Sequence, residues 1–407
     1  MTTGAPVTAS HGQSWLVRQA ATCPPRLVNA GLGVGAEVYA AWLAGSTEYW
    51  TRALARSASP VECLTDALNW WATSQRREPP TWASPHRIVA EWPIARLRDF
   101  TRPEHAADPI VPTLVLPPQA GHDSCIVDFS PRQSQLATIR AAGLTRLASL
   151  DWVGATSATR DCGISDYLAV VDEAVDHLGG RANLIGDCQG GWLAVIYTAL
   201  HPERVNTLTI AGAPVDFHAG QAAIHDWVSL LGSGGDLTFF RSVVEANGGV
   251  LPGEFLLSGF MAMQPAGEVE RQVQLLAHID DPEHVRRYAE FERWFQHTQD
   301  IPGAFYLWIV EHLFAGNGLI KGDLTIDGRP VDVRRITCPL ILLAGATDHI
   351  TPPAQVFALA SAAGTPDELV TELTTTGGHL GLFMGHEALQ QFWPRALRPV
   401  LEASLAR

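Results

Sequence analysis

Asn183-Leu184-Ile185-Gly186-Asp187-Cys188-Gln189-Gly190-Gly191-Trp192-Leu193-Ala194 is the stretch of sequence that decides the fold. A short apolar run leads into a cysteine bracketed by glycines, and a helix-compatible segment follows. This order predicts a strand, a sharp turn and a helix. In such a turn, a nucleophile elbow, the middle residue of Gly-x-nucleophile-x-Gly is strained, and the glycines let strand and helix approach without a Cβ clash. The predicted nucleophile is Cys188 instead of a serine.

Cys188 also has a plainer interpretation, because a free cysteine often behaves as a small buried hydrophobic residue. The surrounding sequence favours the nucleophile. A strand-like run precedes the cysteine, Gly190 and Gly191 follow it, and 192–197 is apolar enough for the buried helix that an elbow needs. A motif of this kind is a hypothesis that further residues of the site have to support.

The composition predicts a globular protein with ample material for a core. The chain has 407 residues, of which 46% are hydrophobic and 17% charged, so disorder is not expected. The net charge of −14 and the lack of any basic run argue against nucleic acid as a partner, because nucleic-acid binders cluster Lys and Arg against the phosphates.

The six cysteines have no Cys-x-x-Cys spacing, which predicts neither a zinc site nor a compact disulfide framework. Reduced thiols in the cytoplasm are the natural interpretation. Met1–Ser10 has neither the basic start nor the apolar stretch of a signal peptide, and no apolar run reaches membrane-spanning length. We therefore expect a cytoplasmic protein without bound metal or integral membrane span.

The order of apolar runs predicts three regions. Residues 1–84 form a helical N-terminal region, where the density of tryptophans leaves partner binding open beside core packing. Residues 85–215 and 335–407 form an α/β core in which 87–92 and 95–100 pair as antiparallel strands. Continuous apolar runs separated by helical patterns then predict buried parallel strands, at 113–116, 145–150, 182–185, 205–210 and 340–344.

The alternation of strands and helices breaks down over 216–334, which is helical and aromatic. An insertion after the strand that follows the elbow is where a lid would lie. Its aromatic residues could instead form only the insertion's own core. A lid over an apolar acyl pocket would need some of them on its inner face.

The other members of a catalytic triad follow downstream. In α/β-hydrolases, the acid and then the histidine follow the nucleophile, on loops after later strands. Asp348 comes just after the strand-like run 340–344, and His379 lies on a glycine-flanked loop after the run 369–373. Each alone could be a helix cap or a solvated side chain. Order, placement and the elbow together predict the triad Cys188, Asp348 and His379.

Three further residues are candidates for the site. The backbone N–H of Gln189 is the expected oxyanion donor. Gln119 is the first residue with an N–H after two prolines in the loop that follows 113–116, and it is the second donor unless that loop is merely a rigid turn. His349 could orient substrate or supply a second hydrogen bond.

Several motifs resemble those of polyhydroxyalkanoate synthases. They are Gly186–Gly191, Leu116–Pro118, Leu319–Leu324 followed by Val331-Asp332, Ala344–Ile350 and Gly377–His379. The chain departs from the synthase pattern at Pro352-Pro353, where these enzymes usually have a tryptophan, after His379, and at 119–122. It is therefore identified with the wider group of synthase-like α/β-hydrolases.

The resemblance implies an α/β-hydrolase fold with a mostly parallel sheet, a helical lid and a helical N-terminal region. It also implies that Cys188 carries the acyl group, that His379 is the base and Asp348 the acid, and that the substrate is a hydroxyacyl-CoA thioester, with no other cofactor. A polyester chain, a homodimer or a helper subunit are the implied partners, and polyester granules the implied location.

Three functions stay open at this point. The first is acyl transfer that forms polyhydroxyalkanoate esters through an acyl-cysteine. The second is hydrolysis by the same triad, as a thioesterase or a polyhydroxyalkanoate depolymerase. The third is a non-catalytic scaffold that binds granules or a partner through the tryptophan-rich N-terminal region.

Overall fold

The computed structural model describes residues 25–76, 78–232 and 236–405, which form two compact units. The first contains Met1–Arg76 and Gln264–Ala289, and the second Arg77–Met263 and Glu290–Arg407. Met1–Ser10, for which no signal peptide is expected, and Cys23 lie outside the described residues. The boundaries 1–84, 216–334 and the two core segments remain a prediction, and the described helices of 216–334 are divided between the two units.

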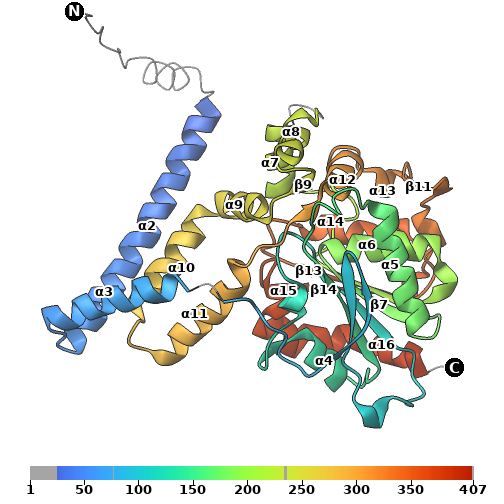
Figure 1. Ribbon diagram of the computed structural model, residues 1–407, viewed down its shortest axis with the longest axis horizontal. Coiled ribbons are helices and arrows are strands. Elements are labelled where there is room, and N and C mark those ends of the chain that lie inside the picture. The colour runs from blue at the N-terminus through green and yellow to red at the C-terminus, as the bar shows by residue number, and fades with distance from the viewer. Residues whose placement is uncertain (1–24, 77, 233–235, 406–407) are drawn as a thin grey trace, which may run out of the picture. The chain divides into compact units, whose positions relative to one another are not determined.

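The second unit is built on one eight-stranded sheet (Figure 1). β1 and β2 are antiparallel, β2 is antiparallel to β6, and all later neighbours are parallel. In spatial order the strands are β1 (Arg87–Trp92), β2 (Ala95–Asp99), β6 (Leu147–Trp152), β3 (Thr113–Leu116), β7 (Ala182–Asp187), β8 (Val205–Ala211), β13 (Leu340–Gly345) and β14 (Val370–Thr375). The predicted α/β-hydrolase fold is confirmed.

Helices cover both faces of the sheet, whose central strands β6, β3, β7, β8 and β13 are buried on both sides. In β13, Leu340 and Leu342 belong to one core cluster, whereas Ile341 and Leu343 belong to the other. Such continuous apolar runs are typical of parallel strands buried on two faces. The first face is covered by α5 (Ile164–His177), α6 (Gln189–Leu200) and α14 (Pro353–Ala362), and the second by α4 (Gln135–Ala141), α15 (Gly381–Met384) and α16 (Trp393–Leu405).

The predicted strands agree closely with the observed ones, with one shift. The run predicted at 145–150 forms β6 two residues later, at Leu147–Trp152. Gly143 has φ +100°, and the Thr145 N–H donates to the Gly143 carbonyl at 3.0 Å. This turn occupies the first residues of the apolar run, so the extended backbone begins after it.

Asn183, in β7, is the centre of a buried hydrogen-bond network. Its Nδ2 donates to the Val111 carbonyl at 3.1 Å and to Ser404 Oγ at 2.9 Å, and its Oδ1 accepts from Asn206 Nδ2 at 2.8 Å and Thr207 Oγ1 at 3.1 Å. A buried polar group that has no hydrogen-bond partner is not compensated for the loss of its bound water. These hydrogen bonds therefore fix the position of β7 relative to its neighbours.

Replacing Asn183 with alanine is expected to lower the free energy of unfolding by about 3 kcal/mol. Several buried groups would then have no hydrogen-bond partner, and each such group costs ~1–3 kcal/mol. Urea unfolding at neutral pH measures the change. Asn69→Ala is the matched control, since Asn69 is exposed on a helix. Equal midpoints for the two variants would contradict the prediction.

The segment between β8 and β13 carries short helices and hairpins. Its elements that lie wholly in the second unit are α7 (Ala223–Leu231), α8 (Thr238–Ala246), β9 (Val250–Leu251), α9 (Gly253–Met263), β10 (Ile301–Pro302), α12 (Gly303–Trp308), the π-helix η4 (Ile309–Ala315), α13 (Gly318–Lys321), β11 (Thr325–Ile326), β12 (Arg329–Pro330) and the 3-10 helix η5 (Val333–Arg335). Asn317 is buried, and its Oδ1 accepts from the Phe217 N–H while its Nδ2 donates to Asp216 Oδ1, both at 2.8 Å. These bonds fix the loop after β8.

The first unit packs α2 (Pro25–Ala55) against α10 (Pro265–Ala277), with α3 (Pro60–Ser74) beside them (Figure 1). A Cβ added to Gly45 would lie 2.6 Å from Val273 Cγ1, so the two helices are close at that point. Trp42, Trp50 and Trp71 are more than half exposed. The helix α11 (Pro282–Phe295) begins in this unit and ends in the second.

None of the helices in the described ranges is long and apolar enough to cross a membrane.

Candidate active site

Cys188 lies at a strained turn between β7 and α6. Its φ is +49° and its ψ −114°, a conformation that residues with a side chain rarely adopt. The Cys188 N–H donates to the Ala211 carbonyl at 2.8 Å, and the Cys188 carbonyl accepts from the Gly191 N–H at 3.0 Å. The predicted strand, sharp turn and helix are therefore present, and the strained cysteine is held from both sides.

The three glycines around Cys188 are required by close backbone contacts. A Cβ on Gly186 would lie 2.5 Å from the Gly190 carbonyl oxygen. On Gly190 it would lie 1.9 Å from the Leu116 carbonyl oxygen, and on Gly191 2.3 Å from Ala213 Cβ. The contacts confirm that the glycines let strand and helix approach, and they place the end of β3 against the start of α6.

Asp348 and His379 meet at the carboxyl end of the sheet. His379 Nδ1 lies 2.7 Å from Asp348 Oδ2, and both side chains are buried. The other carboxylate oxygen, Oδ1, accepts from the N–H groups of Ile350 and Thr351, both at 2.9 Å. The loop after β13 thus fixes the carboxylate, and the carboxylate fixes the histidine ring.

Cys188 lies close enough to His379 for its sulfur to influence the protonation of the ring. Since Nδ1 faces Asp348, Nε2 is left for the sulfur. Burial by itself lowers the pKa of His379, but the charges of Cys188 and Asp348, with the hydrogen bond to Asp348, raise it to about 10. A histidine that is held by a carboxylate and lies beside a cysteine is the arrangement that can activate a thiol. The structure therefore brings all three predicted triad residues together.

Gln189 is the first residue of α6, where a backbone N–H has no carbonyl of a preceding helical turn to pair with. The Gln119 side chain is fully buried. Its Oε1 accepts from the Tyr167 hydroxyl at 2.5 Å and its Nε2 lies 3.5 Å from the Val153 carbonyl. The Gln119 group predicted to bind an oxyanion is its backbone N–H, and both donor assignments stay predictions.

His349 follows the acid, and its carbonyl accepts from the Ala223 N–H at 2.9 Å. Burial lowers its pKa, and the charge of Asp348 opposes this effect. The neutral ring is therefore favoured near pH 7. Its role in orienting substrate stays a prediction.

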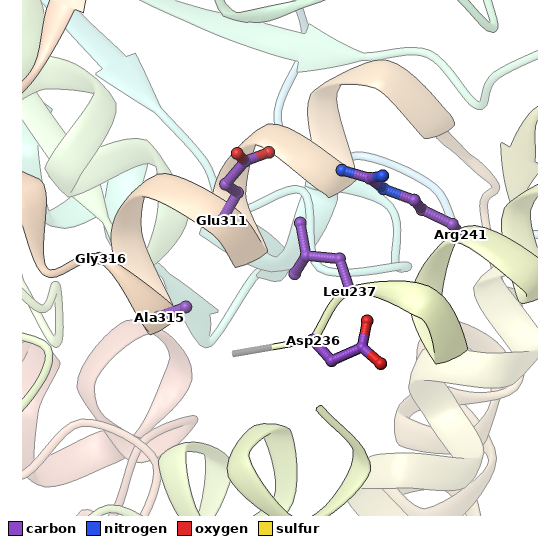
Figure 2. Close-up of a pocket in the computed structure, with 6 residues that line it drawn as sticks. All are labelled: Asp236, Leu237, Arg241, Glu311, Ala315 and Gly316. Atoms are coloured by element: carbon purple, nitrogen blue, oxygen red, sulfur yellow. The ribbon is translucent and has the colours of Figure 1, made fainter. Parts of the chain in front are cut away.

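An open hollow of about 480 Å³ lies between the start of α8 and η4. Figure 2 shows Asp236, Leu237 and Arg241 on one side and Glu311 and Ala315 on η4. None of the three triad residues lines it. The charges along it are of both signs, so it is not built for an ion of one sign.

The sequence-based prediction missed two parts of this site. One is the pair of N–H groups, from Ile350 and Thr351, that hold Asp348. An acid followed by a turn is the signal that could have indicated them. The other is Asp187, whose side chain is fully buried one residue before Cys188. A charged residue at the end of an apolar strand was the signal there.

Residues 95–389 match the family described as "Protein of unknown function (DUF3141)". The chain belongs to the DUF3141 family. Among curated proteins, this DUF3141 chain is 28% identical over 321 residues to the "Poly(3-hydroxyalkanoate) polymerase subunit PhaC" of Allochromatium vinosum, covering 77% of this chain and 87% of that protein. It is 28% identical over 278 residues to the protein of the same name in Haloferax mediterranei, covering 66% of this chain and 54% of that protein. The predicted resemblance to polyhydroxyalkanoate synthases is confirmed.

Two other proteins that are similar to the chain have different names. An "Uncharacterized protein in ackA 5'region" of Rhizobium meliloti is 34% identical to the DUF3141 chain over 183 residues, covering 44% of this chain and 24% of that protein. Among solved structures, the monoacylglycerol lipase of Paleococcus ferrophilus is similar with a TM-score of 0.47 and 15% identity, over 76% of this chain and 99% of the lipase.

Proposed function

We propose that the protein is an acyltransferase that moves a hydroxyacyl group from a CoA thioester to Cys188 and then to a hydroxyl acceptor, forming polyhydroxyalkanoate-type esters. The observation that carries the proposal is His379, which is buried, lies 2.7 Å from Asp348 through Nδ1 and is close to Cys188 at the strained turn. The relatives named poly(3-hydroxyalkanoate) polymerases support the substrate class.

The first step is the acylation of Cys188. His379 Nε2 takes the thiol proton, and the thiolate attacks the thioester carbonyl. The Gln189 N–H stabilises the oxyanion of the tetrahedral intermediate. The carbon–sulfur bond to CoA breaks, and the imidazolium returns its proton to the leaving thiolate. One thioester is exchanged for another, so the acyl-cysteine keeps the free energy needed to acylate an alcohol.

The second step is the transfer to the acceptor. His379 takes the proton of an incoming hydroxyl, whose oxygen attacks the acyl-cysteine, and Cys188 is released with a proton from His379. Asp348 stabilises the imidazolium in both steps. No resident metal or cofactor is required by this chemistry. If the acceptor is the hydroxyl end of an ester chain the product is a polyester, and if it is water the product is a free acid.

The test is incubation of the purified protein with 3-hydroxybutyryl-CoA, followed by mass spectrometry of the products. We expect CoA release together with oligoesters that grow by one hydroxybutyryl unit at a time, and neither product with Cys188→Ala. CoA release with only free 3-hydroxybutyrate would contradict acyl transfer and favour the thioesterase alternative.

Alkylation of Cys188 distinguishes an enzyme from a non-catalytic scaffold. Iodoacetamide should label Cys188 faster in the wild type than in His379→Ala, because the imidazolium favours the thiolate. Peptide mass spectrometry separates this label from that on the half-exposed Cys63, Cys162 and Cys338. Equal rates at Cys188 in both proteins would favour the scaffold.

The proposal includes a setting for the reaction. It places the protein in the cytoplasm, at polyester granules, with a second copy or a helper subunit as its partner. The exposed Trp42, Trp50 and Trp71 of the first unit support a binding role for that unit.

A further inference from the structure

Asp187 and Gln135 form a buried pair directly below the elbow. Asp187 is the last residue of β7, Gln135 is the first residue of α4, and both side chains are fully buried. Gln135 Nε2 donates to Asp187 Oδ1 at 3.1 Å. The proposed acyl transfer gives neither residue a role.

Each residue of the pair has one side-chain oxygen that takes no part in this hydrogen bond. Within the described part of the chain, neither Asp187 Oδ2 nor Gln135 Oε1 has a hydrogen-bond partner, although both atoms are buried. With an ionised carboxylate both atoms are acceptors, so they cannot satisfy each other. Leaving two buried acceptors unpaired, one of them charged, is unfavourable.

One proton resolves both deficits. We propose that Asp187 is protonated on Oδ2 at neutral pH and donates to Gln135 Oε1, so that acid and amide form a ring of two hydrogen bonds that supports the turn of Cys188. In this ring Gln135 is donor at Nε2 and acceptor at Oε1, and Asp187 is acceptor at Oδ1 and donor at Oδ2. No atom of either group remains unpaired.

The surroundings of Asp187 favour the neutral form. Burial raises its pKa to about 8, although the hydrogen bond from Gln135 and the charge of His379 act in the opposite direction. The strands β3 and β8 and the helix α6, which pack against β7, carry no Asp, Glu, Lys, Arg or His. The helix α4, which carries Gln135, has one charged residue, Arg140, in its last turn. The charge that acts on Asp187 is that of His379, on the loop after β14.

A neutral Asp187 has a consequence for Cys188, which rests on the proposed function. An ionised Asp187 would place a negative charge next to the thiolate and compete with it for the imidazolium of His379. The protonated acid supports the turn without that competition. Asp187 is thus a positioning residue, since it acts through Cys188 and His379.

The test compares the wild type with Asp187→Asn, whose amide can form the same two hydrogen bonds at every pH. An acid with a raised folded pKa stabilises below its unfolded pKa of about 3.9 and loses this contribution as the pH rises through the folded value. We expect the unfolding constant of the wild type, relative to the variant, to rise about tenfold per pH unit from pH 5 to 7 and to level off above pH 8. Denaturant unfolding at fixed pH measures it.

The matched control is Asp161→Asn, because Asp161 is exposed and forms only a surface ion pair. Its unfolding constant should keep a pH-independent ratio to that of the wild type. If the ratio of the unfolding constants of Asp187→Asn and the wild type were also independent of pH, the wild-type carboxylate would be ionised and the proposal would be overturned. Unfolding requires no substrate, so this result is independent of whether acyl transfer is found.

Two further measurements keep the proposal testable. The rate of Cys188 alkylation should fall above pH 8 in the wild type relative to Asp187→Asn. If the two proteins showed the same dependence of this rate on pH, a neutral Asp187 would not influence Cys188. If Asp187→Asn does not fold, carboxyl-carbon NMR of the wild type labelled at aspartate should show one buried carboxyl that titrates near pH 8. No aspartate titrating in that range would overturn the proposal.

Discussion

Replacing Asp348 with asparagine is expected to lower kcat for acyl transfer by about 10⁴-fold, with little change in stability. The Asp348 Oδ1 position accepts from two backbone N–H groups, of Ile350 and Thr351, so the asparagine oxygen stays there and its NH₂ faces His379. The ring must then accept at Nδ1 and keeps its proton on Nε2. A histidine in that tautomer cannot take the thiol proton of Cys188. Steady-state CoA release measures the loss.

The matched control for this experiment is Asp367→Asn, because Asp367 is exposed on the short turn before β14, whereas His379 follows the other end of that strand. It should retain wild-type kcat. If Asp348→Asn kept kcat within a few-fold of the wild type, Asp348 would not orient His379. If the variant lost stability as well as activity, the carboxylate would be mainly a structural acceptor for its loop.

Replacing Gly190 with alanine is expected to lower the free energy of unfolding by about 3 kcal/mol or more, or to prevent folding. The added Cβ would lie 1.9 Å from the Leu116 oxygen and 2.8 Å from the Pro117 oxygen, both backbone atoms. No side-chain rotation can relieve this contact. The loop after β3 has to move away from the start of α6, although alanine is intrinsically the better helix residue by about 1 kcal/mol.

Gly381→Ala tests the same substitution where there is room. Gly381 begins a helix in the same unit, and a Cβ there has nothing within 4 Å. Urea unfolding and the soluble yield of the two variants should therefore differ widely. Equal stability of both variants would show that β3 and α6 do not approach as closely as the structure has them.

The central part of the sheet could be predicted because its strands are buried on both faces. Runs such as 182–185 and 340–344 are apolar throughout, and only parallel strands between two helical layers need that pattern. The elbow followed from its glycines. The start of β6 could not be placed, because the turn at Gly143 depends on a positive φ that a run of apolar residues does not reveal.

The three triad residues and their order in the chain could be predicted, but the buried residues that hold them in place could not. Asp348 and His379 each follow a strand, so their meeting at one edge of the sheet follows from parallel topology. Asp187 and Gln135 are 52 residues apart, and their contact depends on α4 beginning where β7 ends. The exposure of the described tryptophans of the first unit could not be predicted either, because Trp42, Trp50, Trp70 and Trp71 lie in two helices of similar apolar content.

The division of the chain has a consequence for truncation. The first unit is made of two separate segments, and α10 lies in the second of them, Gln264–Ala289, which is preceded and followed in the chain by residues of the second unit. A protein shortened to begin at residue 77 would lack α2. Val273, which packs against Gly45 in α2, would then lose this contact. A single cut therefore cannot separate the two units cleanly, and a shortened protein has to lose 264–289 as well.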